Sequence, residues 1–356
     1  MTASAPEHGI SNRLVTVAAV TLAVLAVVGA LSVGRQFFIP IALALFFNTL
    51  LRPLVRRLER FRLPTPAAAA VVVLVLLGTV GVTGTILAGP AEAWMQDAPT
   101  RLRSVQDRVR RIWRPVQRVT AAAGELGRTA TQPDGTKPAI VAAPPSPMLE
   151  GFFGTTATVV AGLVEVILLL YLLLASGSLF LERLLAIIPK RVDQRKAVEI
   201  AAEVEDAVSH YLGITTVINI GQGLVVGAVL WALGMPDPGL WAALTIFLEF
   251  IPYLGGAVLV ALLSVSALGS FPTIGEAALI PTAYLVITTL QNNIVSPLLY
   301  GKRLKLNAVA VLVAVIFWGS LWGILGALLA VPMLASAKIM CDHIEALAPL
   351  GKFLES

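Results

Sequence analysis

The chain has 356 residues, of which 57% are hydrophobic and only 13% are charged, whereas a soluble protein carries about 25% charged residues. This small share of charged residues cannot cover the core of a soluble fold of this length. The composition therefore excludes a soluble protein and indicates one that is embedded in lipid. The formal net charge of +5 does not indicate a nucleic-acid partner, because Lys and Arg flank the apolar segments, as membrane insertion requires.

Apolar segments predict membrane-spanning helices, because a helix satisfies its own backbone hydrogen bonds in lipid and about 20 residues cross the hydrocarbon. The first segment, Leu14 to Val33, is interpreted as a retained helix and not as a cleavable signal peptide. The predicted spans cover residues 13–33, 37–54, 66–89, 151–176, 209–234, 239–270, 275–300 and 308–340. We therefore expect an all-α polytopic membrane protein with about six full spans and two interrupted or re-entrant helical hairpins.

The segments 239–270 and 308–340 are too long for one simple crossing. Each is either a tilted, kinked crossing or a hairpin that enters and leaves on the same side. The hairpins are favoured, because they bring the three basic clusters that follow spans to the cytoplasmic face, together with both termini. The residues expected to interrupt these helices are Pro252, Gly255, Gly256, Gly319 and Gly323.

A weak internal repeat accompanies these interruptions. The block 207–270 is a span followed by an interrupted segment, and the block 277–340 repeats this pattern about 70 residues later. If the first block enters the membrane from inside and the second from outside, the two copies are inverted. Inverted repeats with broken helices at corresponding positions are a recurrent transporter plan.

A segment of different character separates the third and fourth spans. Residues 91–123 carry apolar side chains at spacings of three and four between many arginines, which predicts an amphipathic helix for a coiled-coil contact or for the membrane surface. A Pro-rich linker follows, and the topology places both outside. The expected regions are 1–90 (three spans), 91–150 (extramembrane helix and linker), 151–206 (fourth span and basic cytoplasmic helix), 207–340 (transport core) and 341–356 (tail).

Polar side chains at membrane depth are costly and therefore mark candidate sites. Glu249, in TIFLEFIPYLGG, lies three residues before Pro252. Its carboxyl can bind a cation, relay a proton or accept a hydrogen bond from a substrate hydroxyl. The alternative is a protonated acid bonded to backbone N–H groups that the helix break frees.

Amides form a second set of candidates. Asn219 and Gln222 lie in VINIGQG, and Gln291, Asn292 and Asn293 lie in TTLQNNIVSP. With the 70-residue offset Gln222 aligns with Asn292, so paired spans can offer donors and acceptors to a polar solute. Interhelical hydrogen bonds, worth about 0.6 kcal/mol each, are the alternative. Three consecutive amides cannot all face one neighbouring helix, which favours a polar cavity.

Two further residues complete the candidates. Glu165 lies in the middle of the fourth span, where it can pair with a cation or stay neutral in a protein interface. Pro297, five residues after Asn292, is expected to loosen the seventh span.

The sequence does not indicate an enzyme. It contains no Walker A loop, GxSxG or HExxH motif, and its three histidines lie far apart with no carboxylates grouped beside them. We therefore expect neither a metal centre nor a cofactor. The single cysteine excludes an internal disulfide.

The chain resembles the autoinducer-2 exporter family, also called the PerM-like permease family. The motifs that carry the resemblance are FFIPIALALFFNTLLRPLVRRLER, YLGITTVINIGQGLVVG, LWALGMPDPGLWAALTIFLEFIPYLGG, QNNIVSPLLYGKRLKLNAVAVL and FWGSLWGILGALLAVP. The resemblance implies a multi-pass inner-membrane protein and a homo-oligomer, with a pentamer as the family arrangement. It also implies export of small signalling molecules or, in other members, cation–proton antiport.

Three hypotheses follow. The leading one is a secondary transporter, a permease or exporter, which moves a small polar solute through the bilayer with coupling to H⁺ or Na⁺ at Glu249. The second is a cation–proton antiporter that uses Glu249 or Glu165. The third is a membrane scaffold that moves nothing and recruits partners through the helix at 91–123.

Overall fold

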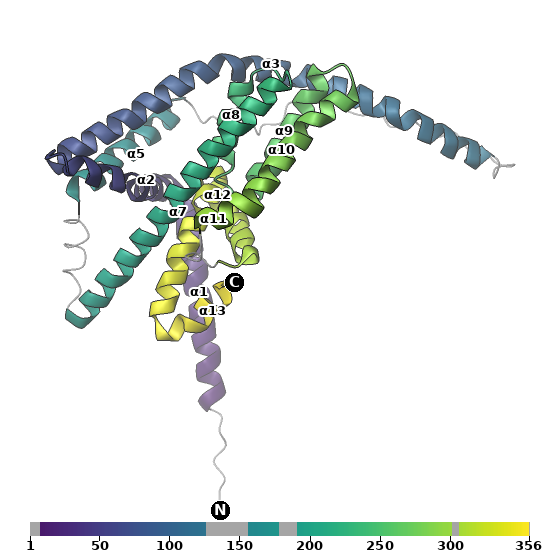
Figure 1. The fold of residues 1–356 in the computed structure, drawn as a ribbon. Helices are drawn as coiled ribbons and strands as arrows, with labels where there is room; N and C mark the ends of the chain where they lie inside the picture. Colours follow the sequence, from purple (N-terminus) through teal and green to yellow (C-terminus); the bar gives the residue numbers. More distant parts are fainter. Residues whose placement is uncertain (1–7, 126–155, 178–190, 301–305, 356) are drawn as a thin grey trace, which may run out of the picture. The chain divides into compact units, whose positions relative to one another are not determined.

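The computed structural model describes residues 8–125, 156–177, 191–300 and 306–355 (Figure 1). Their regular elements are all helical, which confirms the expected all-α class. The elements are α1 (His8–Val33), α2 (Arg35–Glu59), α3 (Thr65–Glu125), α5 (Thr156–Ser176), α7 (Arg191–Ala232), α8 (Pro238–Leu248), α9 (Leu254–Ser270), α10 (Ile274–Leu290), the π-helix η1 (Gln291–Val295), α11 (Ser296–Tyr300), α12 (Ala308–His343), the 3₁₀ turn η2 (Glu345–Leu347) and α13 (Ala348–Leu354).

Within the described residues, six helices are long and apolar enough to cross a membrane. They are Val15–Val33, Arg35–Glu59, Thr65–Thr100, Gln194–Ala232, Ile274–Tyr300 and Ala308–His343. Three shorter apolar helices, Ala161–Ser176, Pro238–Leu248 and Leu254–Ser270, accompany them. These lengths and compositions confirm a polytopic membrane protein.

The helix α3 continues where the sequence predicts a boundary. Its backbone is helical from Thr65 to Glu125, so neither Gly89 nor Pro90 separates the third span from the amphipathic segment 91–123. The side chains of residues 101–102 and 104–125 lie outside the described residues, as do residues 126–147 of the predicted Pro-rich linker 124–147. The predicted contact surface of 91–123 therefore remains a prediction.

The chain divides into two compact units. Unit 1 comprises Met1–Leu74, Val160–Leu212 and Arg303–Ser356, and unit 2 comprises Val75–Val159 and Gly213–Lys302. In unit 1, α12 packs against α2, and the indole of Trp322 donates a hydrogen bond to the carbonyl of Leu31 at 3.0 Å. The buried core of unit 1 includes Phe46, Val208, Leu212, Trp322, Leu329 and Ala335.

Unit 2 is built around α9, which packs against both α8 and α10. The indole of Trp94 on α3 meets that of Trp241 on α8 edge to face, with ring centroids 6.1 Å apart. Gly223 of α7 brings this helix close to α8, because a Cβ at Gly223 would overlap the side chain of Ile246. The core of unit 2 comprises Val226, Leu230, Met235, Trp241, Leu259, Leu263, Ala267, Ala277, Ile280 and Tyr284.

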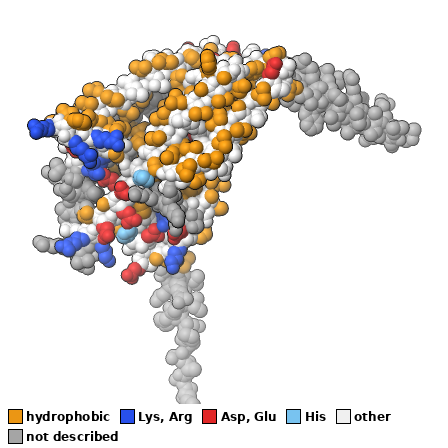
Figure 2. Space-filling model, in the orientation of Figure 1, with side chains coloured by type: hydrophobic (Ala, Val, Ile, Leu, Met, Phe, Trp, Pro, Cys, Tyr) orange, Lys and Arg blue, Asp and Glu red, His pale blue; other side chains and the backbone are white. Residues whose placement is uncertain are grey.

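The surface of the molecule matches a lipid environment. Figure 2 shows hydrophobic side chains over most of the visible surface, whereas charged side chains gather in restricted areas. In unit 2, Trp231 is 74% exposed, Leu224 63% and Leu298 78%. Exposure of such side chains to water is unfavourable in free energy, whereas contact with lipid tails is not.

The segment 239–270 is broken as the sequence predicts. Helix α8 ends at Leu248, Tyr253 has a positive φ of 63°, and α9 begins at Leu254. A Cβ at Gly255 would overlap the carbonyl oxygen of Leu248. Residues seven apart on a straight helix are separated by about 10 Å, so α9 folds back on α8 at this turn.

The segment 308–340 is broken in the same way. Gly323 has φ 65° and ψ −145° inside α12, a conformation that only glycine adopts readily. A Cβ at Gly326 would overlap the carbonyl oxygen of Trp318, and Gly319 lies opposite the methyl group of Ala327. In both predicted interruptions, therefore, a glycine packs against a carbonyl seven or eight residues earlier in the chain.

Candidate functional site

Four polar side chains of unit 2 meet where α8 ends. We call Gln222, Glu249, Tyr284 and Thr288 the polar cluster. The amide nitrogen Nε2 of Gln222 donates to Oε1 of Glu249 at 3.2 Å and to Oγ1 of Thr288 at 3.0 Å. The hydroxyl of Tyr284 also donates to Oε1 of Glu249. The cluster thus joins α7, the end of α8 and α10 around one carboxyl group.

The helix break places Glu249 in this cluster. Glu249 follows the last residue of α8, immediately before the turn that Gly255 makes possible. Gly256 also faces the carboxyl group, since a Cβ there would make ordinary van der Waals contact with the hydroxyl of Tyr284 at 3.5 Å and with Oε1 of Glu249 at 3.7 Å. Helix α10, which carries Tyr284 and Thr288, begins with a cap. There Oγ1 of Thr273 accepts a hydrogen bond from the backbone N–H of Glu276 at 3.2 Å.

Asn219 bonds to the backbone at the end of α8 and not to the polar cluster. Its side chain is 3% exposed, and one orientation of its amide satisfies both polar atoms. The nitrogen then donates to the carbonyl of Thr215 at 3.2 Å, and the oxygen accepts from the backbone N–H of Phe250 at 3.2 Å. The backbone N–H of Phe250 lies beyond the end of α8 and reaches the carbonyl of Phe247 only at 3.4 Å, so the amide oxygen adds a second, shorter acceptor.

Gln222 has one polar atom without a partner. Its side chain is 5% exposed, and Oε1 is buried without a hydrogen bond among the described residues. Leaving a buried acceptor unsatisfied costs about 1–3 kcal/mol. Oε1 of Gln222 can therefore accept a hydrogen bond, beside Glu249, from a solute hydroxyl or a water molecule.

A π-helix follows α10 and carries further polar side chains. In η1 the N–H of Ser296 bonds to the carbonyl of Gln291, five residues earlier. Pro297 follows directly, and a proline ring disfavours the normal bond to the residue four before it, which is Asn293. Nε2 of Gln291 donates to Oγ of Ser296 at 2.8 Å, while Oε1 of Gln291 is buried without a partner among the described residues.

The three consecutive amides differ in their surroundings. Gln291 is half-buried, whereas Asn292 and Asn293 are exposed. Nδ2 of Asn293 donates to the carbonyl of Thr289 in the preceding turn at 2.8 Å. The structure thus brings Gln222 and Glu249 together and places the Asn292 side chain outside the polar cluster.

Four polar residues near the site, Thr215, Tyr284, Thr288 and Tyr300, were not among the candidates predicted from the sequence. Tyr284 and Thr288 precede Gln291 by seven and three residues, so the three share one helical face. On α7, the buried residues Thr215, Asn219 and Gln222 follow the same spacing, and the hydroxyl of Thr215 is 2.8 Å from that of Tyr300 on α11. We call these two rows the polar seam: Thr215, Asn219 and Gln222 on α7, and Tyr284, Thr288, Gln291 and Tyr300 on α10–η1–α11. The rows meet where Gln222 bonds to Thr288 and where Thr215 bonds to Tyr300. Helical spacing among hydroxyl side chains was the signal that could have found them.

The remaining predicted residues lie elsewhere. Glu165 belongs to unit 1, where its side chain is exposed on α5. Gly319 and Gly323 also belong to unit 1, at the break in α12. In the part of the chain that the structure describes, no three His, Cys, Asp or Glu side chains are grouped as a metal site would need.

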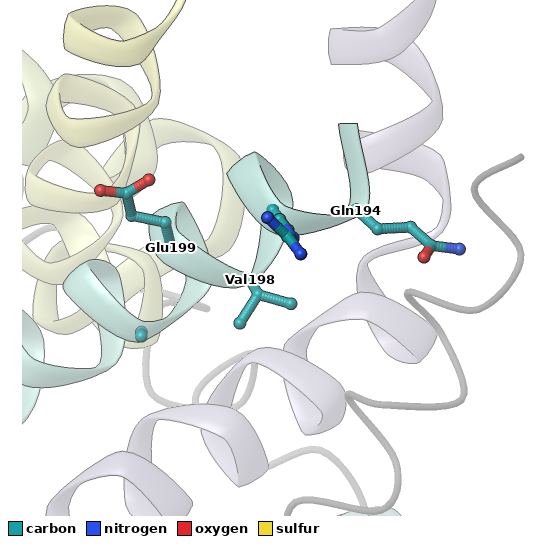
Figure 3. A pocket seen from close by; sticks show the side chains of 5 residues that line it. Gln194, Val198 and Glu199 are labelled. Atoms are coloured by element: carbon teal, nitrogen blue, oxygen red, sulfur yellow. The ribbon is translucent and has the colours of Figure 1, made fainter. Parts of the chain in front are cut away.

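Unit 1 has an open hollow on the first turns of α7. It has a volume of about 390 Å³ and is lined by Gln194, Arg195, Val198, Glu199 and Ala202. Figure 3 shows Gln194, Val198 and Glu199 projecting from this helix in different directions. No predicted site residue contributes to it, so the polar cluster of unit 2 is the candidate site that the chemistry favours.

Comparison with known proteins identifies the family. A sequence profile described as "AI-2E family transporter" matches residues 15–346. The chain is 26% identical to "AI-2 transport protein TqsA" of Escherichia coli (strain K12) over 87% of both sequences. It is also 28% identical to "Putative transport protein MT0215" of Mycobacterium tuberculosis (strain CDC 1551 / Oshkosh), over 88% of this chain and 84% of that protein. The chain belongs to the AI-2E transporter family and is a multi-pass membrane transport protein.

Proposed function

We propose that the protein is a secondary transporter that binds a small polar solute at the polar cluster. The observation that carries the proposal is the buried, unpartnered Oε1 of Gln222 beside the carboxyl group of Glu249. Both groups accept hydrogen bonds, so the solute supplies donors. Glu249 lies at the turn between α8 and α9, with Gln222 of α7 bonded to it, and a site beside a broken helix is typical of transporters.

Charge narrows the solute class. Residues 213–300 contain three acidic side chains, Asp237, Glu249 and Glu276, and no Lys or Arg. An anion would enter this region against a like-charged carboxylate with no cation to compensate it. The proposed solute is therefore neutral or cationic and carries hydroxyl or amine groups.

The named cargo of a relative provides the first solute to test. TqsA is named for transport of AI-2, and the similarity covers 87% of the chain. We propose a small signalling molecule of this kind, with transport coupled to H⁺ or Na⁺ at Glu249. Glu249 is the only carboxyl group in the polar cluster, so one carboxyl group is available there for coupling.

Flux into proteoliposomes tests the proposal. Exchanging Gln222→Leu removes both the donor and the unpartnered acceptor, and we expect flux to fall by about tenfold, because a lost hydrogen bond to a charged group is worth about 1.5–3 kcal/mol. Ser264→Ala is the control, since among the described residues Oγ of Ser264 bonds only to the carbonyl of Val260 on its own helix, at 2.6 Å. Equal flux in wild type and Gln222→Leu would remove the polar cluster from the mechanism.

Cation–proton antiport is the second candidate, because the carboxyl group of Glu249 and the hydroxyl oxygen of Thr288 are oxygen ligands of the kind that hard cations prefer. Proteoliposomes loaded with a pH-sensitive dye distinguish the two functions. Proton movement that depends on an imposed sodium gradient, without any organic solute, supports antiport. Proton movement only in the presence of the solute supports coupled solute transport.

A further inference from the structure

The side chain of Asn292 is exposed on η1 without a protein partner. It makes no hydrogen bond in the part of the chain that the structure describes. It lies five residues beyond the middle of the span Ile274–Tyr300, about 8 Å along the helix at 1.5 Å per residue. With the middle of the span taken at the bilayer midplane, this depth is inside the half-thickness of the hydrocarbon, about 15 Å.

Lipid is a poor environment for this amide. Moving an amide from water into hydrocarbon without a hydrogen bond costs about 4–8 kcal/mol. The neighbouring Asn293 reduces this cost through its bond to the carbonyl of Thr289. Asn292 has no such bond, so the face of η1 that it occupies requires water, a solute or a polar partner.

The polar seam runs along the neighbouring face of the helix, because successive helical residues point about 100° apart. Gln291 precedes Asn292 directly and lies in the row of Tyr284 and Thr288. Oε1 of Gln291 is buried without a partner, as is Oε1 of Gln222 further along the seam. Two unpartnered acceptors on one seam indicate donors that enter from outside the described chain.

We propose that Asn292 and Gln291 line a water-filled section of the solute path, which continues the polar seam beyond the polar cluster. This proposal rests on the proposed function and adds a second part to its site. The section takes hydrogen-bond donors that carry no negative charge, because its side chains are uncharged amides and the only carboxyl group of the adjoining polar cluster is that of Glu249.

Water suits this face better than a second copy of the chain. The exposed side chains of the described spans in unit 2 are mostly aliphatic, such as Leu224, Val225 and Leu279. Such surfaces offer no donors to Asn292 or to the buried oxygen of Gln291. Water and a hydroxylated solute both offer them.

Single-cysteine labelling tests the water-filled section without knowledge of the solute. Cys341→Ser removes the only native cysteine. Asn292→Cys is then compared with Leu290→Cys, an exposed apolar position two residues earlier at nearly the same depth. A cationic and an anionic methanethiosulfonate reagent, both impermeant, are applied to proteoliposomes from both sides. Variants are used only if they elute and melt as the parent does.

We expect Asn292→Cys to react about tenfold faster than Leu290→Cys, because only a thiol in water forms the reactive thiolate. After correction for reactivity with a free thiol, the cationic reagent should react faster than the anionic one. Equal slow labelling at both positions, or complete oxidative cross-linking between copies at Asn292→Cys, would overturn the proposal. Flux is not measured here, so failure of the water-filled section and failure of the polar cluster are distinguished.

Discussion

Tyr284 and Glu249 are 35 positions apart in the sequence, yet the hydroxyl of Tyr284 donates a hydrogen bond to the carboxyl group of Glu249. Tyr284 is buried in the core of unit 2, with α9 packed between α8 and α10. The bond therefore ties the turn after α8 to the middle of α10. A change at either residue is expected to affect both the hairpin and the candidate site.

Tyr284→Phe removes this donor and keeps the ring in the core. We expect flux to fall about fivefold to tenfold and stability to fall by about 1 kcal/mol, because one net hydrogen bond to Glu249 is lost. Tyr253→Phe is the control, since Tyr253 is 60% exposed and outside the polar cluster. Flux and thermal unfolding in detergent check both effects. A Tyr284→Phe protein that transports like Tyr253→Phe would show that this bond is not needed.

Proton coupling predicts a pH dependence that one residue controls. Glu249→Gln keeps the shape of the side chain and removes its ionisable group, so we expect flux to become independent of pH and to lose its response to a proton gradient. Glu276→Gln, in the exposed first turn of α10, keeps the wild-type profile. The measurement is flux against pH in proteoliposomes. A wild-type profile in Glu249→Gln would place the coupling elsewhere.

The two breaks predict the same sensitivity to a methyl group. Gly255→Ala and Gly326→Ala each place a Cβ against a carbonyl oxygen, of Leu248 and Trp318 respectively. Because backbone atoms cannot move aside cheaply, we expect each change to lower stability by about 1–3 kcal/mol or more. Gly221→Ala, which meets nothing within 4 Å, is the control and should unfold at or above the wild-type temperature. Wild-type unfolding of Gly255→Ala would contradict the closed turn.

Unit 1 provides a matched pair of arginines. Nε of Arg52 is 3.2 Å and Nη2 of Arg56 is 2.9 Å from Oε1 of Glu205, but Arg52 also donates to the carbonyl of Gly177 at 3.0 Å. The Arg56 side chain is 60% exposed, so Arg56→Ala should cost less than about 1 kcal/mol. Arg52→Ala loses two interactions in a less exposed place and should cost about 1–3 kcal/mol. Chemical unfolding ranks the two variants, and an equal loss would contradict this assignment.

Sequence alone determined the class of the protein and where its helices break. Apolar runs predict spans because lipid leaves helices as the only way to satisfy the backbone, and Pro252, Gly255 and Gly323 mark interruptions through local backbone preferences. These are properties of short segments, so they can be recognised without knowledge of the rest of the chain. Gln222 and Glu249 could be named as costly polar groups for the same reason.

Tertiary structure decided which of these polar groups meet. Gln222 bonds to Glu249 and Thr288. Asn219 instead accepts from the backbone N–H of Phe250, and Asn293 donates to its own helix. Sequence spacing assigns a side chain to a helical face, but it does not say which face of another helix packs against it. That choice depends on close packing between segments far apart in the chain, such as the approach of α7 to α8 at Gly223.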